Sequence, residues 1–238
     1  MTDTFAENAP FPADFLNQAG INRQHVFSLD ALPAKVLATL GDTDGYRQLI
    51  LLGHGGRALW ECVKASGMLS EHPIDDYCVR AVTRWFADFL PGRHYRILYP
   101  GEQPVGLQQL GKLAGWHQPS PFMVGIDAEW GTWFAYRAAI LADTDFLPFS
   151  PVERSNPCLA CPGQPCLTAC PAGALAGGSF AFELCRSYRL SESSACATTC
   201  VAREACPVGA EHRYDKDQLA HSYSRSLAMI RQYPTGKP

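Results

Sequence analysis

Eight cysteines gather between residues 158 and 206 of the 238-residue chain, whereas only Cys62 and Cys78 precede them. The first group reads Cys-x2-Cys-x4-Cys-x3-Cys-Pro, and the second, after a single cysteine, reads Cys-x3-Cys-x5-Cys-Pro. A cubane iron–sulfur cluster needs four thiolates, and in chains with two clusters the cysteine before the proline belongs to the other cluster. This pattern predicts two 4Fe-4S clusters.

The crossed pairing uses all eight thiols of the region. The predicted ligands are, for the first cluster, Cys158, Cys161, Cys166 and Cys206, and for the second cluster, Cys170, Cys185, Cys196 and Cys200. Proline has a fixed φ and no N–H, which suits a chain that leaves one cluster and turns toward the next. Three spacings are longer than two residues, so two zinc sites of four thiolates are an alternative, as are disulfides or free thiols.

Cys62 and Cys78 lie outside these groups. Cys78 falls on an apolar helical stripe, where a lone cysteine usually behaves as a small hydrophobic residue. Both are predicted to be core residues. Residues 1–20 contain acidic residues and two prolines but no basic segment followed by an apolar one, so a secretory signal is not expected. We therefore expect a cytoplasmic protein, whose reducing surroundings favour metal-bound thiols over disulfides.

The composition limits the remaining function classes. Apolar residues make up 47% of the chain and charged residues 18%, which allows a sizeable core. No run approaches the roughly 18 consecutive apolar residues of a membrane helix, so no membrane association is expected. With 20 basic and 23 acidic residues the net charge is −3, which makes nucleic acid an unexpected partner.

The elements that must position the thiols follow from the apolar periodicity. Strand-like and helix-like segments alternate before the cysteines, which predicts an α/β (α+β) layer domain. The predicted strands are 25–29, 48–52 and 95–99, with a hairpin of 122–126 and 133–141; the predicted helices are 11–21, 57–68, 74–90, 107–114 and 217–233. A proline-rich stretch at 148–157 predicts a boundary between domains 1–150 and 151–238.

Three segments of the first domain resemble known families. Residues 131–141, which begin Gly-Thr-Trp-Phe, resemble the Gly-[Gly/Ser]-Trp-Phe segment of epoxyqueuosine reductases and of cobalamin-processing (decyanase and dealkylase) proteins, and Arg137 matches only the latter. Residues 72–79 and 48–60 also resemble the processing proteins. The cysteine region instead resembles the reductases, in which a cysteine followed by Ser-Tyr lies between the two motifs, as in residues 185–188.

This resemblance implies a nitroreductase-like domain that binds base-off cobalamin, followed by a ferredoxin-like domain with two iron–sulfur clusters and a C-terminal helix. Reductive dehalogenases are similar in plan. The proton-donating Asp of the epoxyqueuosine reductases is missing from residues 101–104, where Glu102 is the one acidic side chain. Their Gly-Lys-His-Thr loop is replaced by residues 115–118. The resemblance therefore favours cobalamin chemistry over epoxyqueuosine reduction.

Four residues are candidates to contact the corrinoid. Trp116, Trp133 and Phe134 are candidate walls for a flat macrocycle, which needs apolar lining and few polar anchors. Arg137 is a candidate contact to a corrinoid side chain, because the matching Arg of the processing family contacts glutathione. As alternatives, the aromatic residues belong to the core, and Arg137 is exposed or salt-bridged. FMN competes for this domain, since nitroreductase-like domains commonly bind it.

Two further motifs carry weaker signals. Residues 53–56, Gly-His-Gly-Gly, follow a strand and precede a helix, where backbone N–H groups favour anions, although the dinucleotide spacing is missing. His54 and His117 are candidates to approach a cobalt face, with ordinary structural roles as the alternative.

The leading hypothesis is an iron–sulfur oxidoreductase that passes electrons from its two clusters to cobalamin. Reduction of cobalt weakens the bond to its upper ligand, such as cyanide, without a side-chain acid or base. The electron donor is expected to be a flavoprotein or a ferredoxin. The alternatives are a corrinoid-dependent reductase of an organic substrate, an FMN-dependent reductase, a non-catalytic cobalamin chaperone or electron carrier, and a zinc-stabilised binding module.

Overall fold

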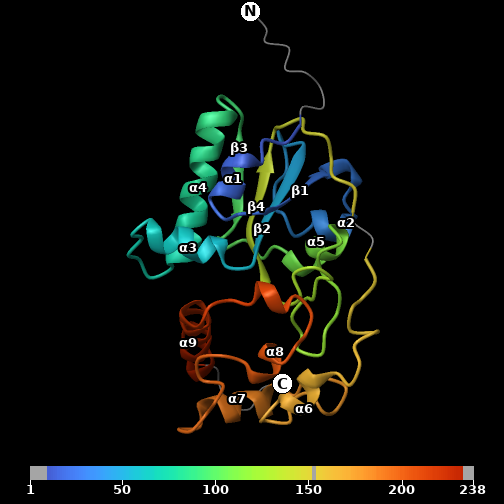
Figure 1. Ribbon diagram of the computed structural model, residues 1–238. Helices are drawn as coiled ribbons and strands as arrows, with labels where there is room; N and C mark the ends of the chain where they lie inside the picture. Colours follow the sequence, from blue (N-terminus) through green and yellow to red (C-terminus); the bar gives the residue numbers. More distant parts are fainter. Residues whose placement is uncertain (1–9, 152–153, 233–238) are drawn as a thin grey trace, which may run out of the picture. The chain divides into compact units, whose positions relative to one another are not determined.

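A four-stranded antiparallel sheet organises the larger part of the chain (Figure 1). The computed structural model describes residues 10–151 and 154–232. Its strands are β1 (Arg23–Ser28), β2 (Gln48–Gly55), β3 (Tyr95–Tyr99) and β4 (Phe134–Ala142), in the spatial order β1-β2-β4-β3. The two central strands are the apolar ones: β2 is buried along its whole length, and Ile50 of β2 lies opposite Ile140 of β4.

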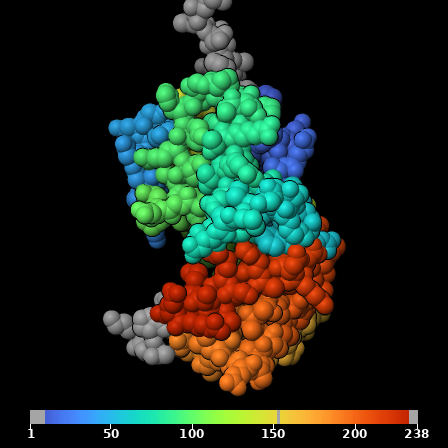
Figure 2. All heavy atoms as spheres, turned by 90° about the vertical axis from the view of Figure 1, so that its left-hand side faces the viewer, coloured from blue at the N-terminus to red at the C-terminus, as the bar shows by residue number. Residues whose placement is uncertain are grey.

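Helices cover both faces of this sheet, which confirms the α/β prediction. Alternate side chains of a strand point to opposite faces. Ile50 and Leu52 therefore pack in one core cluster with α1 (Asp14–Gln18), α3 (Ala58–Ala65) and α4 (Pro73–Phe89). Leu49 and Leu51 pack in a second cluster with α2 (Ala34–Leu37) and α5 (Leu107–Leu113). Figure 2 shows α3 and α4 together on one face.

The longest helix of the sheet domain follows the predicted apolar stripe. Pro73 occupies the start of α4, where its missing N–H costs no helical hydrogen bond. Trp85 is fully buried on the stripe, and Phe86 stacks on Tyr95 with ring centroids 3.9 Å apart. Cys78 is fully buried on the same stripe, which confirms that it is a core residue. Cys62 is only half-buried and points its thiol to the Gln18 carbonyl, 3.5 Å away.

The predicted hairpin of 122–126 and 133–141 is wrong. β4 pairs with β2 and β3 instead, because an apolar strand in the middle of a sheet needs a neighbour on each side. Residues 122–126 form no strand, and near them Gln118 and Ile126 make an isolated bridge. The strand predicted at 48–52 also continues through Gly55, so residues 53–56 are not a loop between strand and helix.

The described residues fall into two compact units, which differ in character. Unit 1 contains residues 10–117 and 134–151 and includes the sheet; unit 2 contains residues 118–133 and 154–232. The segment 118–133, which precedes the predicted boundary at 150, thus packs with the cysteine region. Of the helices that the structure describes, none has both the length and the apolar character needed to span a membrane.

Unit 2 contains little regular structure. Its helices are α6 (Pro165–Ala169), α7 (Phe182–Leu190), α8 (Val201–Glu204) and α9 (Lys216–Gln232), with a short 3-10 turn at Ala210–His212. A small apolar cluster joins Trp133, Tyr214 and Leu219, with Tyr223 packed against it. Since so small a core buries few side chains, groups bound by the cysteines would add to the stability of this unit.

Candidate functional site

Two short helices connect the thiols of unit 2. Cys166 lies in α6 and Cys170 follows its last residue, whereas Cys200 precedes α8 and Cys206 follows it. The helices α6 and α8 pack against each other. In the predicted pairing each helix therefore leads from a ligand of one cluster to a ligand of the other.

The thiols interact electrostatically in two sets of four. The pKa of Cys158 is raised to about 11, mainly by burial and in addition by the neighbouring thiols of Cys206, Cys166 and Cys161. Burial likewise raises the pKa of Cys185 to about 11, with contributions from Cys200, Cys170 and Cys196. We call these the first set (Cys158, Cys161, Cys166, Cys206) and the second set (Cys170, Cys185, Cys196, Cys200). They are the same two sets that the sequence pattern predicts.

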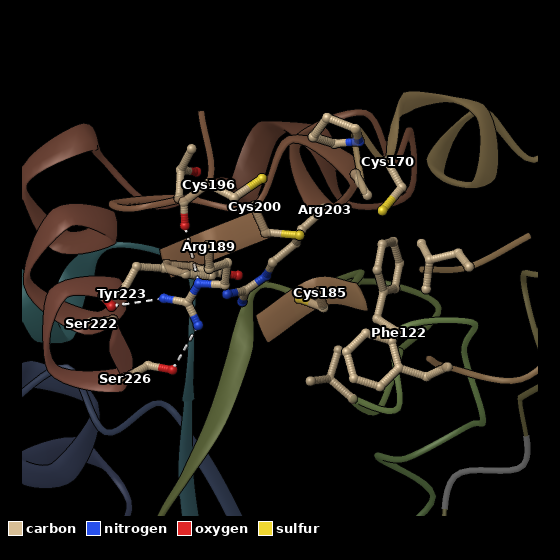
Figure 3. A pocket seen from close by; sticks show the side chains of 16 residues that line it. Phe122, Cys170, Cys185, Arg189, Cys196, Cys200, Arg203, Ser222, Tyr223 and Ser226 are labelled. Carbon is tan, nitrogen blue, oxygen red and sulfur yellow. Dashed lines mark hydrogen bonds between the residues drawn. The ribbon is translucent and has the colours of Figure 1, made fainter. Parts of the chain in front are cut away.

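All four cysteines of the second set line one cavity of about 370 Å³ (Figure 3). Apolar side chains form much of the remaining wall, among them Phe122 from the segment 118–133 and Phe180. Arg189 and Arg203 also line it, although the sequence pattern did not single them out. An apolar shell that excludes water is typical of redox centres, whose potentials depend on solvent access.

The donor atoms fit iron–sulfur clusters. Thiolates are the ligands that such clusters require, and four of them are neighbours in each set. The ligands of a cubane bind at its four separate corners, and each set offers four thiols. The ligand assignment itself stays a prediction.

Trp133 is a core residue of unit 2. Its indole is fully buried, with the Tyr214 ring centroid 5.5 Å away and the Arg203 guanidinium 4.4 Å from its own ring centroid. Phe134, the next residue, begins β4 in unit 1. Of the four predicted corrinoid contacts, Trp133 thus belongs to one unit, and Trp116, Phe134 and Arg137 belong to the other.

Trp116 and Phe134 lie around an arginine that the sequence analysis missed. The guanidinium of Arg23 is 4.5 Å from the ring centroid of Trp116 and 4.9 Å from that of Phe134. Such cation–π contacts hold the two rings in place. Arg23 is the first residue of the edge strand β1, and no feature of its sequence surroundings distinguishes it.

Arg137 is placed by an irregularity of the sheet. Leu52 pairs with Ala138 and Gly53 with Tyr136, so Arg137 is the extra residue of a β-bulge, a feature that redirects a side chain. Its Nε donates to Nδ1 of His54 over 3.0 Å, and its Nη1 lies 3.7 Å from Oδ1 of Asp75.

The two histidines of interest are structural partners of other side chains. His54 is fully buried inside β2, which contradicts its expected place in an anion-binding loop. Nδ1 of His117 lies 3.2 Å from the Tyr136 hydroxyl, and burial together with Lys112 lowers the pKa of His117. The side chain of Tyr136 packs against Gly111, where a Cβ atom on residue 111 would collide with the Tyr136 hydroxyl.

Comparison with known proteins shows similarity in fold. No protein-family model matches the chain, and no curated protein is similar to it in sequence. The similar solved structures include an epoxyqueuosine reductase in complex with a modified tRNA stem loop, with a TM-score of 0.54 and 12% identity over 87% of this chain and 67% of the reductase. This similarity establishes a shared fold.

Two other solved structures represent the further families named above. A catabolic reductive dehalogenase has a TM-score of 0.49 and 13% identity over 89% of this chain and 33% of its own. The C. elegans B12-trafficking protein CblC has a TM-score of 0.48 and 10% identity over 91% of each chain. Epoxyqueuosine reductases, one of the families that the sequence resembles, thus occur among the structures that share this fold. The chain spans about two thirds of the reductase and one third of the dehalogenase.

Proposed function

We propose that the protein is an iron–sulfur oxidoreductase that binds cobalamin and passes electrons to its cobalt from two 4Fe-4S clusters. The observation that carries this proposal is the division of eight thiols into two sets of four neighbours. Two thiolate sets in one small unit suit an electron relay, because such clusters transfer single electrons. A flavoprotein or a ferredoxin would supply these electrons.

The residues of unit 2 would hold and shield the clusters. The first and second sets would each bind one cluster through four thiolates. Phe122 and Phe180 would keep water from the cluster of the second set. When bound, the clusters supply one-electron transfer, and the corrinoid supplies a reducible cobalt whose bond to the upper ligand weakens on reduction.

The cobalamin part of the proposal rests on the resemblance and on one contact. Residues 72–79 and 131–141 are the segments similar to cobalamin-processing proteins, and they meet where Asp75 faces Arg137 over 3.7 Å. The polar group of Arg137, Asp75 and His54 would anchor corrinoid amides, because a guanidinium donates several hydrogen bonds in a fixed geometry. Trp116 and Phe134, held by Arg23, would supply apolar wall.

Metal analysis of anaerobically purified protein tests the first half of the proposal. Brown protein with about eight irons per chain is the expected result, since each cluster contains four. A colourless protein that contains zinc instead of iron would overturn it and favour a zinc-stabilised module.

Spectroscopic titration tests the second half. Hydroxocobalamin is expected to bind with the spectral change of the base-off form. Binding of FMN without that change would instead show a flavin reductase. With dithionite as reductant, release of cyanide from cyanocobalamin is expected, and reduction or binding without release would show a carrier or chaperone.

A second candidate function is reduction of an organic substrate in tRNA. It is favoured by the shared fold with an epoxyqueuosine reductase whose structure includes a tRNA stem loop. Against it, Glu102 is the one acidic residue in the stretch that should hold the proton-donating Asp, and it is exposed. Tight binding of an epoxyqueuosine-modified stem loop, with turnover to queuosine under reducing conditions, would establish this function in place of the first.

A further inference from the structure

Arg203 lies between the two sets of thiols. It is part of α8, three residues after Cys200 of the second set and three before Cys206 of the first. Arg203 lines the cavity of the second set and precedes Cys206 of the first set by three residues. One guanidinium is therefore placed to act on both sets.

Contacts with Thr132, Trp133 and Tyr214 determine the position of Arg203. Its Nε donates to Oγ1 of Thr132 over 3.2 Å, and its Nη2 donates to the Thr132 carbonyl oxygen. The guanidinium lies 4.4 Å from the ring centroid of Trp133 and 5.1 Å from that of Tyr214. These contacts keep a permanent positive charge in a largely apolar environment.

The second set has an arginine of its own. Arg189 of α7 is buried and donates to the carbonyl oxygen of Cys196 over 3.1 Å, to Oγ of Ser226 over 3.0 Å and to the carbonyl oxygen of Tyr223 over 2.9 Å (Figure 3). Its side chain lines the same cavity as the four thiols of the second set. All three guanidinium nitrogens of Arg189 thus donate hydrogen bonds, next to the second set.

The first set has the equivalent partner in Arg213. Its Nη2 donates to the carbonyl oxygen of Cys206 over 3.1 Å. Its Nε is buried and has no hydrogen-bond partner among the described residues, which leaves a donor available to a bound group.

The carboxylates that the structure describes do not neutralise these three charges. Within the described residues, none of these three guanidinium groups has an ion pair, whereas Arg154 pairs with Glu129 over 3.0 Å. The carboxylate next to Arg203 in sequence, that of Glu204, accepts a hydrogen bond from Thr199. Uncompensated charges act strongly in partly buried surroundings, where the effective dielectric constant is low.

We propose that Arg203 raises the reduction potentials of both clusters, while Arg189 raises that of the second set alone and Arg213 that of the first set alone. This inference rests on the proposed function. Reduction takes one electron from an external donor, adds one negative charge to the cluster and breaks no bond. A positive charge nearby stabilises the reduced form, and net charge and hydrogen bonds are known determinants of cluster potential.

The test is a redox titration of the anaerobic protein, followed by electron paramagnetic resonance. Arg189→Gln is expected to shift one of the two cluster signals to more negative potential, Arg213→Gln the other, and Arg203→Gln both. A Cys185→Ala variant, which lacks a second-set ligand, identifies the signal of each set. Arg84→Gln removes an exposed arginine of unit 1 and is expected to leave both potentials unchanged.

Lysine variants separate the role of charge from a merely structural role. Arg189→Lys and Arg213→Lys keep the charge and are expected to restore much of the potential that the Gln variants lose. Equal effects of Lys and Gln, or unchanged potentials in variants that retain both clusters, would overturn the inference. If Arg203→Gln fails to bind iron, the shifts in reduction potential of Arg189→Gln and Arg213→Gln, each expected in one cluster, decide whether the inference holds. A wild-type protein without any cluster signal would refute the proposed function itself.

Discussion

Gly131 lies in direct backbone contact with Val208, so close that a Cβ atom on residue 131 would collide with the Val208 carbonyl oxygen. The contact is reciprocal, because a Cβ atom on Gly209 would lie 2.5 Å from the carbonyl carbon of Trp130. Both glycines have positive φ angles, +59° and +63°, which other residues adopt with strain. This glycine pair joins the segment 118–133 to the cysteine region.

The substitution Gly131→Ala is therefore expected to destabilise unit 2 by about 3 kcal/mol, through the collision and the unfavourable φ. Thermal unfolding and iron content measure the effect. Gly177→Ala is the matched control, since a Cβ atom there meets no atom within 4 Å and no positive φ is required. If both variants unfold at the wild-type temperature, the close backbone contact between Gly131 and Val208 is contradicted.

Alanine substitutions in the two sets are expected to remove iron independently. Cys158→Ala would lose the first cluster and Cys196→Ala the second, about four of eight irons each, because every cubane needs its full set of ligands. Iron analysis after anaerobic purification gives the result. Cys62→Ala, outside both sets, is expected to retain all the iron. If Cys158→Ala and Cys196→Ala lose the same cluster signal in electron paramagnetic resonance, the predicted pairing is contradicted.

Replacement of Arg137 by Met is expected to weaken binding of hydroxocobalamin about tenfold. That factor corresponds to about 1.4 kcal/mol, the order of a hydrogen bond to a charged group. The variant loses the contacts to His54 and Asp75. Titration by absorbance gives the affinity, and Arg80→Met on α4 is the control. Unchanged affinity in a folded Arg137→Met protein would remove this residue from the proposed corrinoid site.

Unit 1 is expected to lose stability in mild acid because of His25. Its imidazole packs 4.3 Å from the Phe27 ring, and burial lowers its pKa to about 4. Between that pH and the ordinary pKa of about 6.5, the unfolded chain binds a proton that the folded protein does not. Stability is thus lost as the pH falls through this window, by about 3 kcal/mol in total.

Urea unfolding at pH 7 and pH 4.5 checks this expectation. The variant His25→Phe is expected to lose much less stability between the two pH values than the wild type does. The cysteine region is the same in both proteins, so their difference isolates His25. His94→Gln, at an exposed position, serves as the control. An identical pH dependence in wild type and His25→Phe would contradict the assignment.

Much of the sheet domain was predictable from local patterns. The apolar periodicity of 74–90 and the apolar run at 48–52 located α4 and β2 to within a few residues. The first repeats with the period of a helix, and the second is typical of a strand that is buried on both faces. The hairpin prediction failed at β4 because strand pairing is not a local property of the sequence. Which strands flank an apolar strand depends on the whole sheet, and residues 122–126 belong to the other unit.

The sequence by itself determined which thiols are candidates for each cluster, because ligand spacing and the proline after each group are local properties of the chain. It also determined that Cys78 is a core residue, through its place on an apolar stripe. Only the tertiary structure decided that Trp133 belongs to the core of unit 2, that a bulge directs Arg137 to His54, and that Arg203 packs between Trp133 and Tyr214. These relationships depend on contacts between residues far apart in the sequence, and no local pattern encodes such contacts.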